Sequence, residues 1–341
     1  MGIWFDKYKD VFFKKYSETD LKKSVEQYLD GSGILDIVTR HFFDELIHKC
    51  CNGKGISRYE NTDTPYDAIQ NDIFVDHIYE YMYKHKDLFT KATELKTVND
   101  EIDDKWISMI RMYFRFSHPR KVAQFPIKNV KKVIDILYPD HDWFDKPLNY
   151  HDASCGFGMR LCGSTLNNCN YFGTDPNKEL NVKLVELYSF LKKYFNCGKA
   201  DIRCIGSETY IPDWKNLMDL SFTSPPYFNL EVYSNDGCKS TLNYDNYSKW
   251  LEEFAVPSIN NTVKYLKKDG YICINIKNIV RYNLYDDYNE ILKSHKELIE
   301  CEPIDFEMNT VRNYKVFNTN CNEKISDRDT YKEKIMVYRK K

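Results

Sequence analysis

The feature that most limits the fold of this chain is a short apolar run that stops at two prolines. Leu220-Ser221-Phe222-Thr223 has the character of a buried strand, and Ser224-Pro225-Pro226-Tyr227 follows it directly. Because proline cannot donate to a sheet ladder, the strand must end there and open into a rigid loop. In open α/β sheets, ligands bind at this edge, outside the carboxyl ends of the strands.

The chemistry of this Ser-Pro-Pro-Tyr loop (residues 224–227) suits the binding of an amine. Each proline fixes φ at about −65° and removes an N–H, so the loop presents carbonyl oxygens without competing donors. These carbonyls and the Ser224 hydroxyl can accept hydrogen bonds from an amino group, and the ring of Tyr227 offers a face for a planar base. The candidate catalytic residues are therefore Ser224, Pro225, Pro226 and Tyr227. The same tetrapeptide also occurs in ordinary loops, so the interpretation depends on a second motif.

That second motif is a glycine turn upstream in the chain. The pattern predicts a strand ending near Asp152, a turn with glycines at 156 and 158, and a second strand ending at Asp175. Glycines let the backbone approach a ligand closely. An acid after the second strand can hold two ribose hydroxyls, as it does in dinucleotide folds. The third glycine of the dinucleotide fingerprint is replaced by Leu161, so a nucleoside without a pyrophosphate fits better than a nicotinamide cofactor.

The ordered pair of motifs resembles the S-adenosylmethionine-dependent amino-methyltransferases of DNA, which modify the exocyclic nitrogen of adenine or cytosine. Three segments carry the resemblance: Asp-Ala-Ser-Cys-Gly-Phe-Gly at 152–158, Gly-Thr-Asp-Pro-Asn at 173–177, and Thr-Ser-Pro-Pro-Tyr-Phe-Asn-Leu-Glu at 223–231. It covers residues 111–341 of this chain. The resemblance implies a class I methyltransferase fold, an α/β Rossmann-like mixed sheet of seven strands. It also implies S-adenosylmethionine as the cofactor and a flipped base of duplex DNA as the substrate.

The resemblance also implies where the ligands bind. A third strand is expected from residue 200, with Ser207 and Glu208 at its end beside the adenine of the cofactor, although Glu208 fits an ordinary polar loop equally well. The cofactor-binding residues expected in all are Asp152, Ala153, Ser154, Cys155, Gly156, Gly158, Asp175, Pro176, Ser207 and Glu208. Phe228 and Asn229 are expected to contact the substrate, and no metal is expected. Methylation of cytosine at carbon 5 is disfavoured because it needs a nucleophilic cysteine, usually after proline, and the chain has no Pro-Cys dipeptide.

The rest of the predicted catalytic domain, residues 148–341, alternates helices and strands. This alternation favours a doubly wound sheet. Gly270 is expected to cap the helix that begins at Trp250, and the last strand is expected to be antiparallel. Helices are predicted from about Met159, at 178–195 and at 250–266, and strands at 271–276, 304–311 and 333–339.

Residues 1–104 predict a helical N-terminal domain. Apolar residues recur at helical spacing before and after a break at Gly31-Ser32-Gly33, with a stripe from Ile34 to Leu46, and further helices are expected at 73–85 and 101–114. The segment has 21 acidic and 14 basic residues, so most of it is not expected to face DNA. Partner binding or target recognition stays open, and packing alone also accounts for its aromatic residues. The neighbouring Cys50 and Cys51 are expected to be buried or inert.

A basic segment at 105–147 is expected to connect the two domains and to pack on the catalytic one. Its first part, residues 105–132, has eight basic residues, no acidic residue and several aromatic ones. Such a stretch can follow a phosphate backbone, and Arg115 and Arg120 are its candidate DNA contacts. A solvated helix face is the alternative.

The overall composition excludes several classes of protein. A net charge of −2 argues against wholesale wrapping of DNA, so contact with DNA must come from a local patch. Eleven cysteines without a Cys-x-x-Cys pair or a signal peptide indicate reduced thiols in a cytoplasm. No apolar run is long enough to span a membrane. The Asn- and Tyr-rich composition is reminiscent of viral or AT-rich genomes.

The sequence leaves several assignments open. Adenine and cytosine are both possible targets, and the same chemistry could act on RNA or on a protein glutamine. A catalytically silent partner subunit with the same fold is a further alternative. No long segment follows the catalytic domain, so target recognition is expected in the N-terminal helices, in the 229–249 loop or in 311–330, and the oligomeric state is undetermined.

Overall fold

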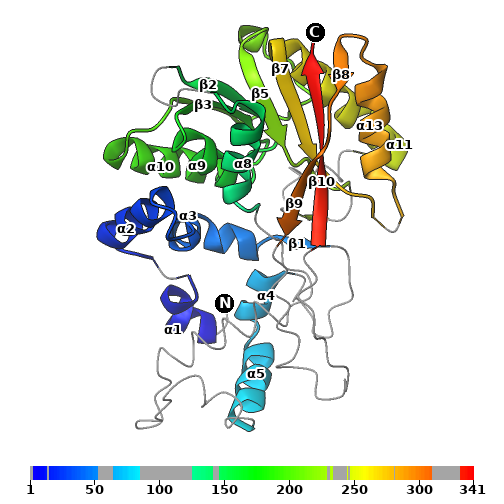
Figure 1. Cartoon of the computed structure of the whole chain (residues 1–341). Helices are drawn as coiled ribbons and strands as arrows, with labels where there is room; N and C mark the ends of the chain where they lie inside the picture. Colours follow the sequence, from blue (N-terminus) through cyan, green and yellow to red (C-terminus); the bar gives the residue numbers. More distant parts are fainter. Residues whose placement is uncertain are drawn as a thin grey trace.

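The structure is a computed structural model, drawn in Figure 1. The predictions for Arg115, Arg120, Asn229 and the helix at 101–114 lie outside the residues that it describes. The described residues are 3–13, 15–52, 64–84, 125–140, 146–228, 231–232, 244, 246–279, 281–308 and 331–341.

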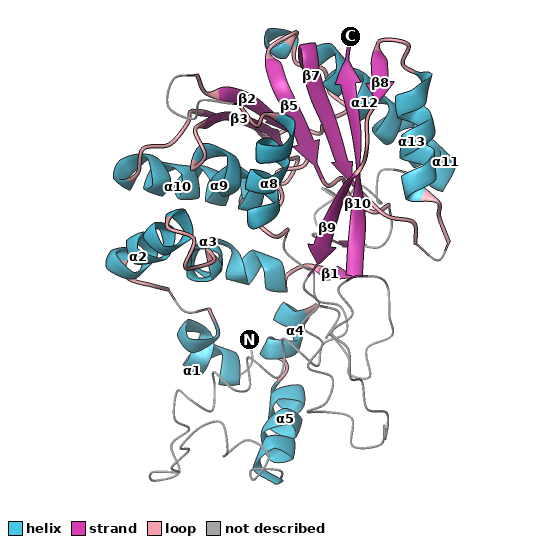
Figure 2. Ribbon diagram, viewed as in Figure 1, coloured by secondary structure: helices cyan, strands magenta, loops and turns pink. Residues whose placement is uncertain are grey.

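A mixed sheet of eight strands, in the order β4-β3-β2-β5-β7-β10-β8 with β9 also paired to β10, forms the centre of the molecule (Figures 1 and 2). The neighbouring pairs among β4, β3, β2, β5 and β7 are parallel, and β10 is antiparallel to β7, β8 and β9. The strands are β2 (Leu148–Asp152), β3 (Cys169–Thr174), β4 (Ala200–Arg203), β5 (Met218–Thr223), β7 (Leu266–Asn275), β8 (Leu298–Glu300), β9 (Ile304–Met308) and β10 (Tyr331–Lys340).

The strand count agrees with the expected seven because β8 and β9 are two halves of one strand. Both pair with β10, Glu300 lying opposite Tyr338 and Ile304 opposite Ile335. Pro303 lies in the gap between them, and it cannot donate to a ladder. The class I methyltransferase, Rossmann-like fold predicted from the sequence is therefore confirmed, including its antiparallel final strand.

Helices cover both faces of the sheet (Figure 2). Alternate residues of β7 face opposite layers, as the period of two in a strand requires: Cys273 packs with the first layer, and Ile272 and Ile274 pack with the second. The helices of the first layer are α8 (Lys128–Leu137), α9 (Met159–Thr165) and α10 (Lys178–Tyr194). Those of the second are α11 (Tyr247–Trp250), a π-helical turn at Leu251–Ala255, α12 (Val256–Tyr265) and α13 (Leu284–Ser294).

The junction between α12 and β7 differs from the prediction. The helix ends at Tyr265, and residues 267–270 belong to β7 instead of forming a glycine cap. The left-handed residue is Asp269, with φ of 62°, and not Gly270. A Cβ on Gly270 would lie 2.9 Å from the carbonyl oxygen of Asp219 in β5, so the glycine permits a close approach of two strands at a register shift.

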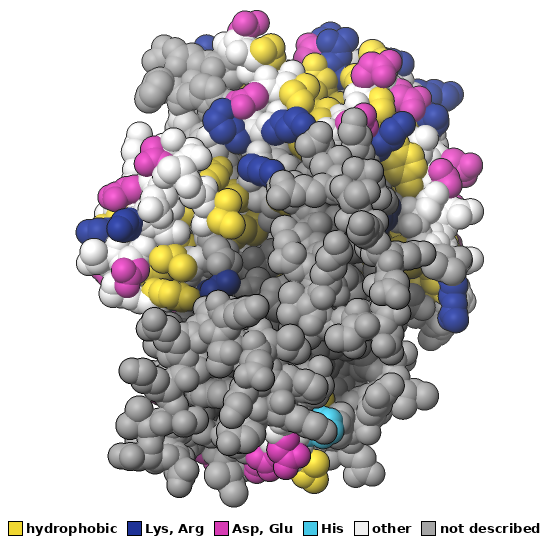
Figure 3. Space-filling view, turned by 60° about the horizontal axis from the view of Figure 1, so that its bottom comes forward, with side chains coloured by type: hydrophobic (Ala, Val, Ile, Leu, Met, Phe, Trp, Pro, Cys, Tyr) yellow, Lys and Arg dark blue, Asp and Glu magenta, His cyan; other side chains and the backbone are white. Residues whose placement is uncertain are grey.

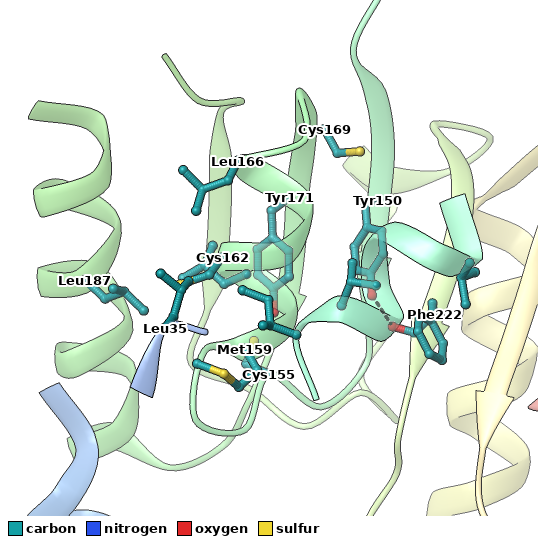
Figure 4. Close-up of a cluster of buried hydrophobic side chains, with 14 of the residues drawn as sticks. Leu35, Tyr150, Cys155, Met159, Cys162, Leu166, Cys169, Tyr171, Leu187 and Phe222 are labelled. Carbon is teal, nitrogen blue, oxygen red and sulfur yellow. Dashed lines mark hydrogen bonds between the residues drawn. The ribbon is translucent and has the colours of Figure 1, made fainter. Parts of the chain in front are cut away.

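The N-terminal helices pack against the first layer. Leu21 and Phe43 belong to the same buried cluster as residues of the sheet and of α10, and Figure 4 shows Leu35 among side chains of this cluster. In Figure 1 these helices lie beyond the carboxyl ends of β5 and β7. The helix predicted at 73–85 is confirmed. The N-terminal helices are α1 (Ile3–Phe12), α2 (Glu18–Leu29), α3 (Asp36–His48), α4 (Pro65–Gln70) and α5 (Asp72–Lys84).

A short ladder joins this N-terminal part to the chain that follows the Ser-Pro-Pro-Tyr loop. The strand β1 (Cys51–Asn52) pairs antiparallel with β6 (Glu231–Val232). The two strands lie far apart in sequence, and nothing in the sequence indicated the pairing. Cys50, immediately before β1, is buried as predicted, and its thiol donates to the carbonyl of Leu46.

Candidate active site

The parallel strands bring the two sequence motifs to one edge of the sheet. β2 lies between β3 and β5, and all three run in the same direction. Asp152 ends β2, Asp175 follows β3, and Ser224 follows β5. The turn after Asp152 (residues 153–158, the glycine turn), the acid after the second strand and the Ser-Pro-Pro-Tyr loop therefore share the carboxyl edge of adjacent strands.

Asp152 is the point at which these parts are joined. Its side chain is fully buried, and its carboxylate accepts hydrogen bonds from the hydroxyls of Thr223 and Tyr171, each at 2.9 Å. It also accepts a 3.2 Å bond from the backbone N–H of Ser154 in the glycine turn. The predicted cofactor residue thus has internal partners that hold the turn and the end of β5 together.

Arg160, which was not predicted from the sequence, completes this network. Its guanidinium donates from Nε to Asp152 at 2.8 Å and from Nη2 to the carbonyl of Ser154. The side chain is 5% exposed, and the ring of Phe125 lies 5.3 Å from the guanidinium carbon. A buried carboxylate needs a paired cation and hydrogen-bond donors, and Arg160 supplies the cation for Asp152.

The two glycines of the turn have different surroundings. Both have left-handed backbones, with φ of 53° at Gly156 and 73° at Gly158. A Cβ on Gly158 would lie 2.7 Å from Leu187 of α10 and 3.1 Å from Phe43 of α3, so this glycine is required by packing. A Cβ on Gly156 would have its nearest neighbours at 3.8 Å, so the backbone there is open for a ligand.

The remaining residues of the turn are held by β3. The backbone N–H of Cys155 donates to the carbonyl of Thr174, and the Thr174 hydroxyl donates to the carbonyl of Ala153. Burial raises the pKa of the Cys155 thiol well above its ordinary value, so this thiol stays protonated. Pro176, the residue after Asp175, is exposed.

Asp175 presents a carboxylate to the glycine turn. One oxygen accepts the backbone N–H of Gly156 at 3.2 Å, and the other accepts that of Asn177 at 3.1 Å. Burial raises the pKa of the Asp175 carboxyl group from 3.8 to about 6. Both oxygens keep lone pairs for further donors, as two ribose hydroxyls would require.

Ser207 and Glu208 lie beyond the third strand, in the loop that follows β4. Ser207 is buried, and its hydroxyl lies 2.8 Å from that of Ser258 in α12. Asn261, also in α12, donates to the carbonyls of both residues. These bonds fix the loop against the second layer, and a cofactor contact by either side chain stays a prediction.

The Ser-Pro-Pro-Tyr loop is anchored by the residue that follows it. Phe228 is 6% exposed and has a left-handed backbone with φ of 37°. Its ring lies 5.2 to 5.7 Å from the rings of Tyr247, Trp250 and Tyr282. The predicted substrate contact is thus placed in an aromatic cluster, while Tyr227 is only partly buried. A bulky residue at positive φ is strained, and here the packing holds it in place.

The residues of this edge fit a nucleoside cofactor. The open backbone at Gly156 and the free lone pairs of Asp175 are the features that support the fit. Among the described residues, no group of three or more His, Cys, Asp or Glu is placed to hold a metal ion. No helix in the described ranges is long and apolar enough to cross a bilayer.

The chain is similar to several solved structures. No family model and no curated protein matches the sequence. Among solved structures, magnesium protoporphyrin IX methyltransferase from Synechocystis PCC 6803 with bound S-adenosylmethionine matches with a TM-score of 0.41 and 12% identity, over 78% of this chain and 97% of that one. TrmN from Thermus thermophilus matches with a TM-score of 0.39 and 8% identity, over 64% and 49%.

A third match is the N-methyltransferase NodS from Bradyrhizobium japonicum WM9 in complex with S-adenosylhomocysteine. Its TM-score is 0.36 and its identity 10%, over 62% of this chain and 86% of that one. At identities this low, the substrate of each neighbour belongs to that protein alone. The strand order itself defines the class, which is the class I methyltransferase fold.

Proposed function

We propose that this protein transfers a methyl group from S-adenosylmethionine to the exocyclic amino group of a flipped base in DNA, at N6 of adenine or N4 of cytosine. One observation carries the proposal. The loop that suits an amine follows β5 directly, and Thr223, the residue before it, is bonded to the carboxylate that also holds the glycine turn. Amine and methyl donor would therefore meet across two neighbouring strands.

Asp175 and the glycine turn would hold the cofactor. Asp175 has the lone pairs for two ribose hydroxyls, and Gly156 leaves its backbone accessible. When bound, S-adenosylmethionine supplies an electrophilic methyl group on a sulfonium. Asp152 has no part in that contact through its carboxylate, which is fully engaged inside the protein; it keeps the turn in its shape.

Ser224, Pro225 and Tyr227 would orient the target. The Ser224 hydroxyl and the Pro225 carbonyl accept hydrogen bonds from the amino group, which directs its lone pair toward the methyl donor. Stacking on Tyr227 contributes about 1 to 3 kcal/mol for a base. Orientation of this kind supplies several kcal/mol of the barrier without a strong base. Ser224 is then an acceptor and not a nucleophile.

The imidazole of His151 is buried and neutral. It is 1% exposed, its Nδ1 lies 2.9 Å from the Ser221 hydroxyl, and burial lowers its pKa to about 3. It faces the second layer, where it packs against Trp214 and Tyr265. A Ser-His-Asp mechanism at Ser224 would need a histidine that can take a proton at neutral pH, and His151 cannot do so.

The charge of the chain requires any contact with DNA to be local. On the face shown in Figure 3, described Lys and Arg side chains are interspersed with Asp and Glu side chains. The net charge of the chain is −2. Flipping a base costs a few kcal/mol, which the site has to supply through stacking and hydrogen bonds. The proposal places these contacts in the Ser-Pro-Pro-Tyr loop.

A transfer assay with three acceptors tests the proposal. Labelled methyl transfer from S-adenosylmethionine is measured to AT-rich duplex DNA, to RNA of the same sequence and to a protein extract, with Tyr227→Ala beside the wild type. Tyr188→Ala is the matched control, since its hydroxyl donates to Gly198 at the opposite edge of the sheet. We expect transfer to DNA that Tyr227→Ala reduces at least tenfold, about the effect of losing one stacking contact.

Other results would redirect the proposal. Transfer to RNA alone or to protein alone would support the proposed methyl transfer to an amine and contradict DNA as the substrate. Cofactor binding, shown by calorimetry, without transfer to any acceptor would instead support a catalytically silent partner subunit.

A further inference from the structure

A ribbon of two strands forms a wall beside the candidate active site. β10 runs past the end of β7, and its first residues pair with β9, Tyr331 opposite Met308 and Ile335 opposite Ile304. Ile335 is also opposite Asn275, the last residue of β7. In Figure 1 this ribbon projects beyond the carboxyl ends of β5 and β7 toward β1.

The base of the ribbon carries three polar side chains that bond to one another. Lys277 donates from Nζ to Glu333 at 3.1 Å, and Asn275 donates from Nδ2 to the other oxygen of Glu333 at 3.5 Å. Asn275 is 4% exposed, and the side chain of Glu333 is 11% exposed. The side chain of Lys277 is 46% exposed, so a nearly buried carboxylate fixes an ammonium group that reaches the surface.

These side chains extend from the face of the sheet to which Ser224 belongs by the alternation of β5, whereas Tyr227 packs against the second-layer cluster. Asn275 is two residues after Cys273, and Ser224 is two residues after Phe222; both Cys273 and Phe222 pack in the first-layer core. Thr223 is opposite Ile274 in the β5–β7 ladder, so Ser224 and Asn275 are the next residues on strands about 4.8 Å apart.

The strand order places these three polar side chains on one side of the Ser-Pro-Pro-Tyr loop and the glycine turn on the other. The order is β2-β5-β7-β10, with the turn on β2, the amine-binding loop on β5 and the polar group on β7 and β10. In the complex proposed above, the methyl donor takes the β2 side of the amine, which leaves the β7 side for the adjoining atoms of the ring. Lys277 is the cation of this group.

We propose that Lys277, oriented by Glu333, binds the hydrogen-bond acceptor next to the methylated amine, which is N1 in adenine and N3 in cytosine. The inference rests on the proposed function and deepens it. Both target amines are attached to a carbon that is bonded to such a ring nitrogen. An ammonium group has three donors and no acceptor, so it discriminates a ring nitrogen from a C–H at that position. Glu333 accepts an N–H of Lys277 and so holds the ammonium group just after β7, the strand next to the one that the loop follows.

Base analogues that lack the acceptor test this contact. Duplex oligonucleotides carry adenine or 1-deazaadenine, and cytosine or 3-deazacytosine, at the methylated position, and kcat/KM is measured for wild type and Lys277→Met. We expect Lys277→Met to lower kcat/KM about 10- to 100-fold on the natural base, the usual effect of one hydrogen bond to a charged group. On the deaza base the variant and the wild type should be equal, because the acceptor is already missing.

The comparison within one variant removes any effect of folding. The ratio of kcat/KM for natural and deaza base does not depend on how much of the variant is folded. Lys268→Met is the matched control, since it removes an exposed lysine from the other end of β7 and should leave the ratio at the wild-type value.

Two outcomes would overturn the inference. Wild-type transfer that Lys277→Met leaves unchanged, or lowers equally on both bases, means that the pair only holds β10 beside β7. Absence of wild-type transfer to any of the oligonucleotides overturns the proposed substrate, and the inference with it.

Discussion

The hydroxyl of Thr223 donates to the carboxylate of Asp152 at 2.9 Å, across the boundary between β5 and β2. Thr223 precedes the Ser-Pro-Pro-Tyr loop, and Asp152 precedes the glycine turn. Arg160 pairs with the same carboxylate at 2.8 Å. One buried ion pair therefore sets the position of the amine-binding loop relative to the cofactor turn, and a shift of either would move the reacting groups apart.

Replacing Thr223 with valine should lower the rate of transfer more than it lowers binding. The variant keeps the shape of the side chain and removes one of the donors to a buried carboxylate, at a cost of about 1.5 to 3 kcal/mol in unfolding free energy. We expect kcat to fall about tenfold with little change in KM, because misplacement of reacting groups affects the transition state. Steady-state kinetics and urea unfolding measure the two effects.

Ser221→Ala is the control for this variant. Ser221 lies in the same strand and bonds to the buried, neutral His151, which faces the second layer. The control should lose stability and keep the wild-type kcat. Equal loss of kcat in both variants would contradict a specific role for the bond between Thr223 and Asp152.

Alanine at the two glycines of the turn should separate packing from ligand binding. Gly158→Ala combines a left-handed backbone with a Cβ 2.7 Å from Leu187, so we expect it to lower the unfolding free energy by about 2 to 4 kcal/mol. Gly156→Ala meets open space, so its cost should be nearer 1 kcal/mol, the strain of the backbone alone. Its main effect should be weaker binding of S-adenosylmethionine. Thermal unfolding and calorimetry of both variants test this, and the reverse ranking in stability would refute the account of the turn.

The affinity for the cofactor should fall as the pH is lowered through about 6. The pKa of Asp175 is raised to about 6 by burial, so its carboxylate becomes protonated below that pH and loses acceptor capacity for the ribose hydroxyls. In the free protein, the same raised pKa means that the stabilising contribution of the protonated acid is present below pH 3.8 and is lost as the pH rises through about 6.

Calorimetric titrations from about pH 5 to about pH 8 should show Kd rising by up to about tenfold per pH unit below the pKa of Asp175. Asp175→Asn is the control: it should bind weakly with a flat pH profile. A wild-type profile as flat as that of the variant would show that Asp175 does not hold the cofactor.

The elements at this edge were predictable because each depends on local sequence. Two prolines end β5, and the glycines at 156 and 158 open the turn before α9, so the strands and the order of the motifs follow from short patterns. The prediction of an apolar stripe after the break at 31–33 is less accurate. Ile34 was predicted to begin this stripe, but it lies before α3, which begins at Asp36, and it is 70% exposed.

Contacts between distant segments were not predictable from local pattern. Arg160 lies in the first turn of a helix, and only its pairing with the buried Asp152, beside the ring of Phe125, shows that it turns inward. The pairing of Lys277 with Glu333 and the ladder of β1 with β6 each join residues far apart in sequence. A single sequence has no periodic signal for either of them.

The position of the transferred methyl group tests the central claim most directly. Wild-type protein is incubated with S-adenosylmethionine and AT-rich duplex DNA, the DNA is digested to nucleosides, and the products are identified by mass spectrometry. The account predicts N6-methyladenine or N4-methylcytosine, at a level at least tenfold lower in DNA treated with Tyr227→Ala. Unmodified DNA, or a methyl group on carbon 5 of cytosine, would contradict it.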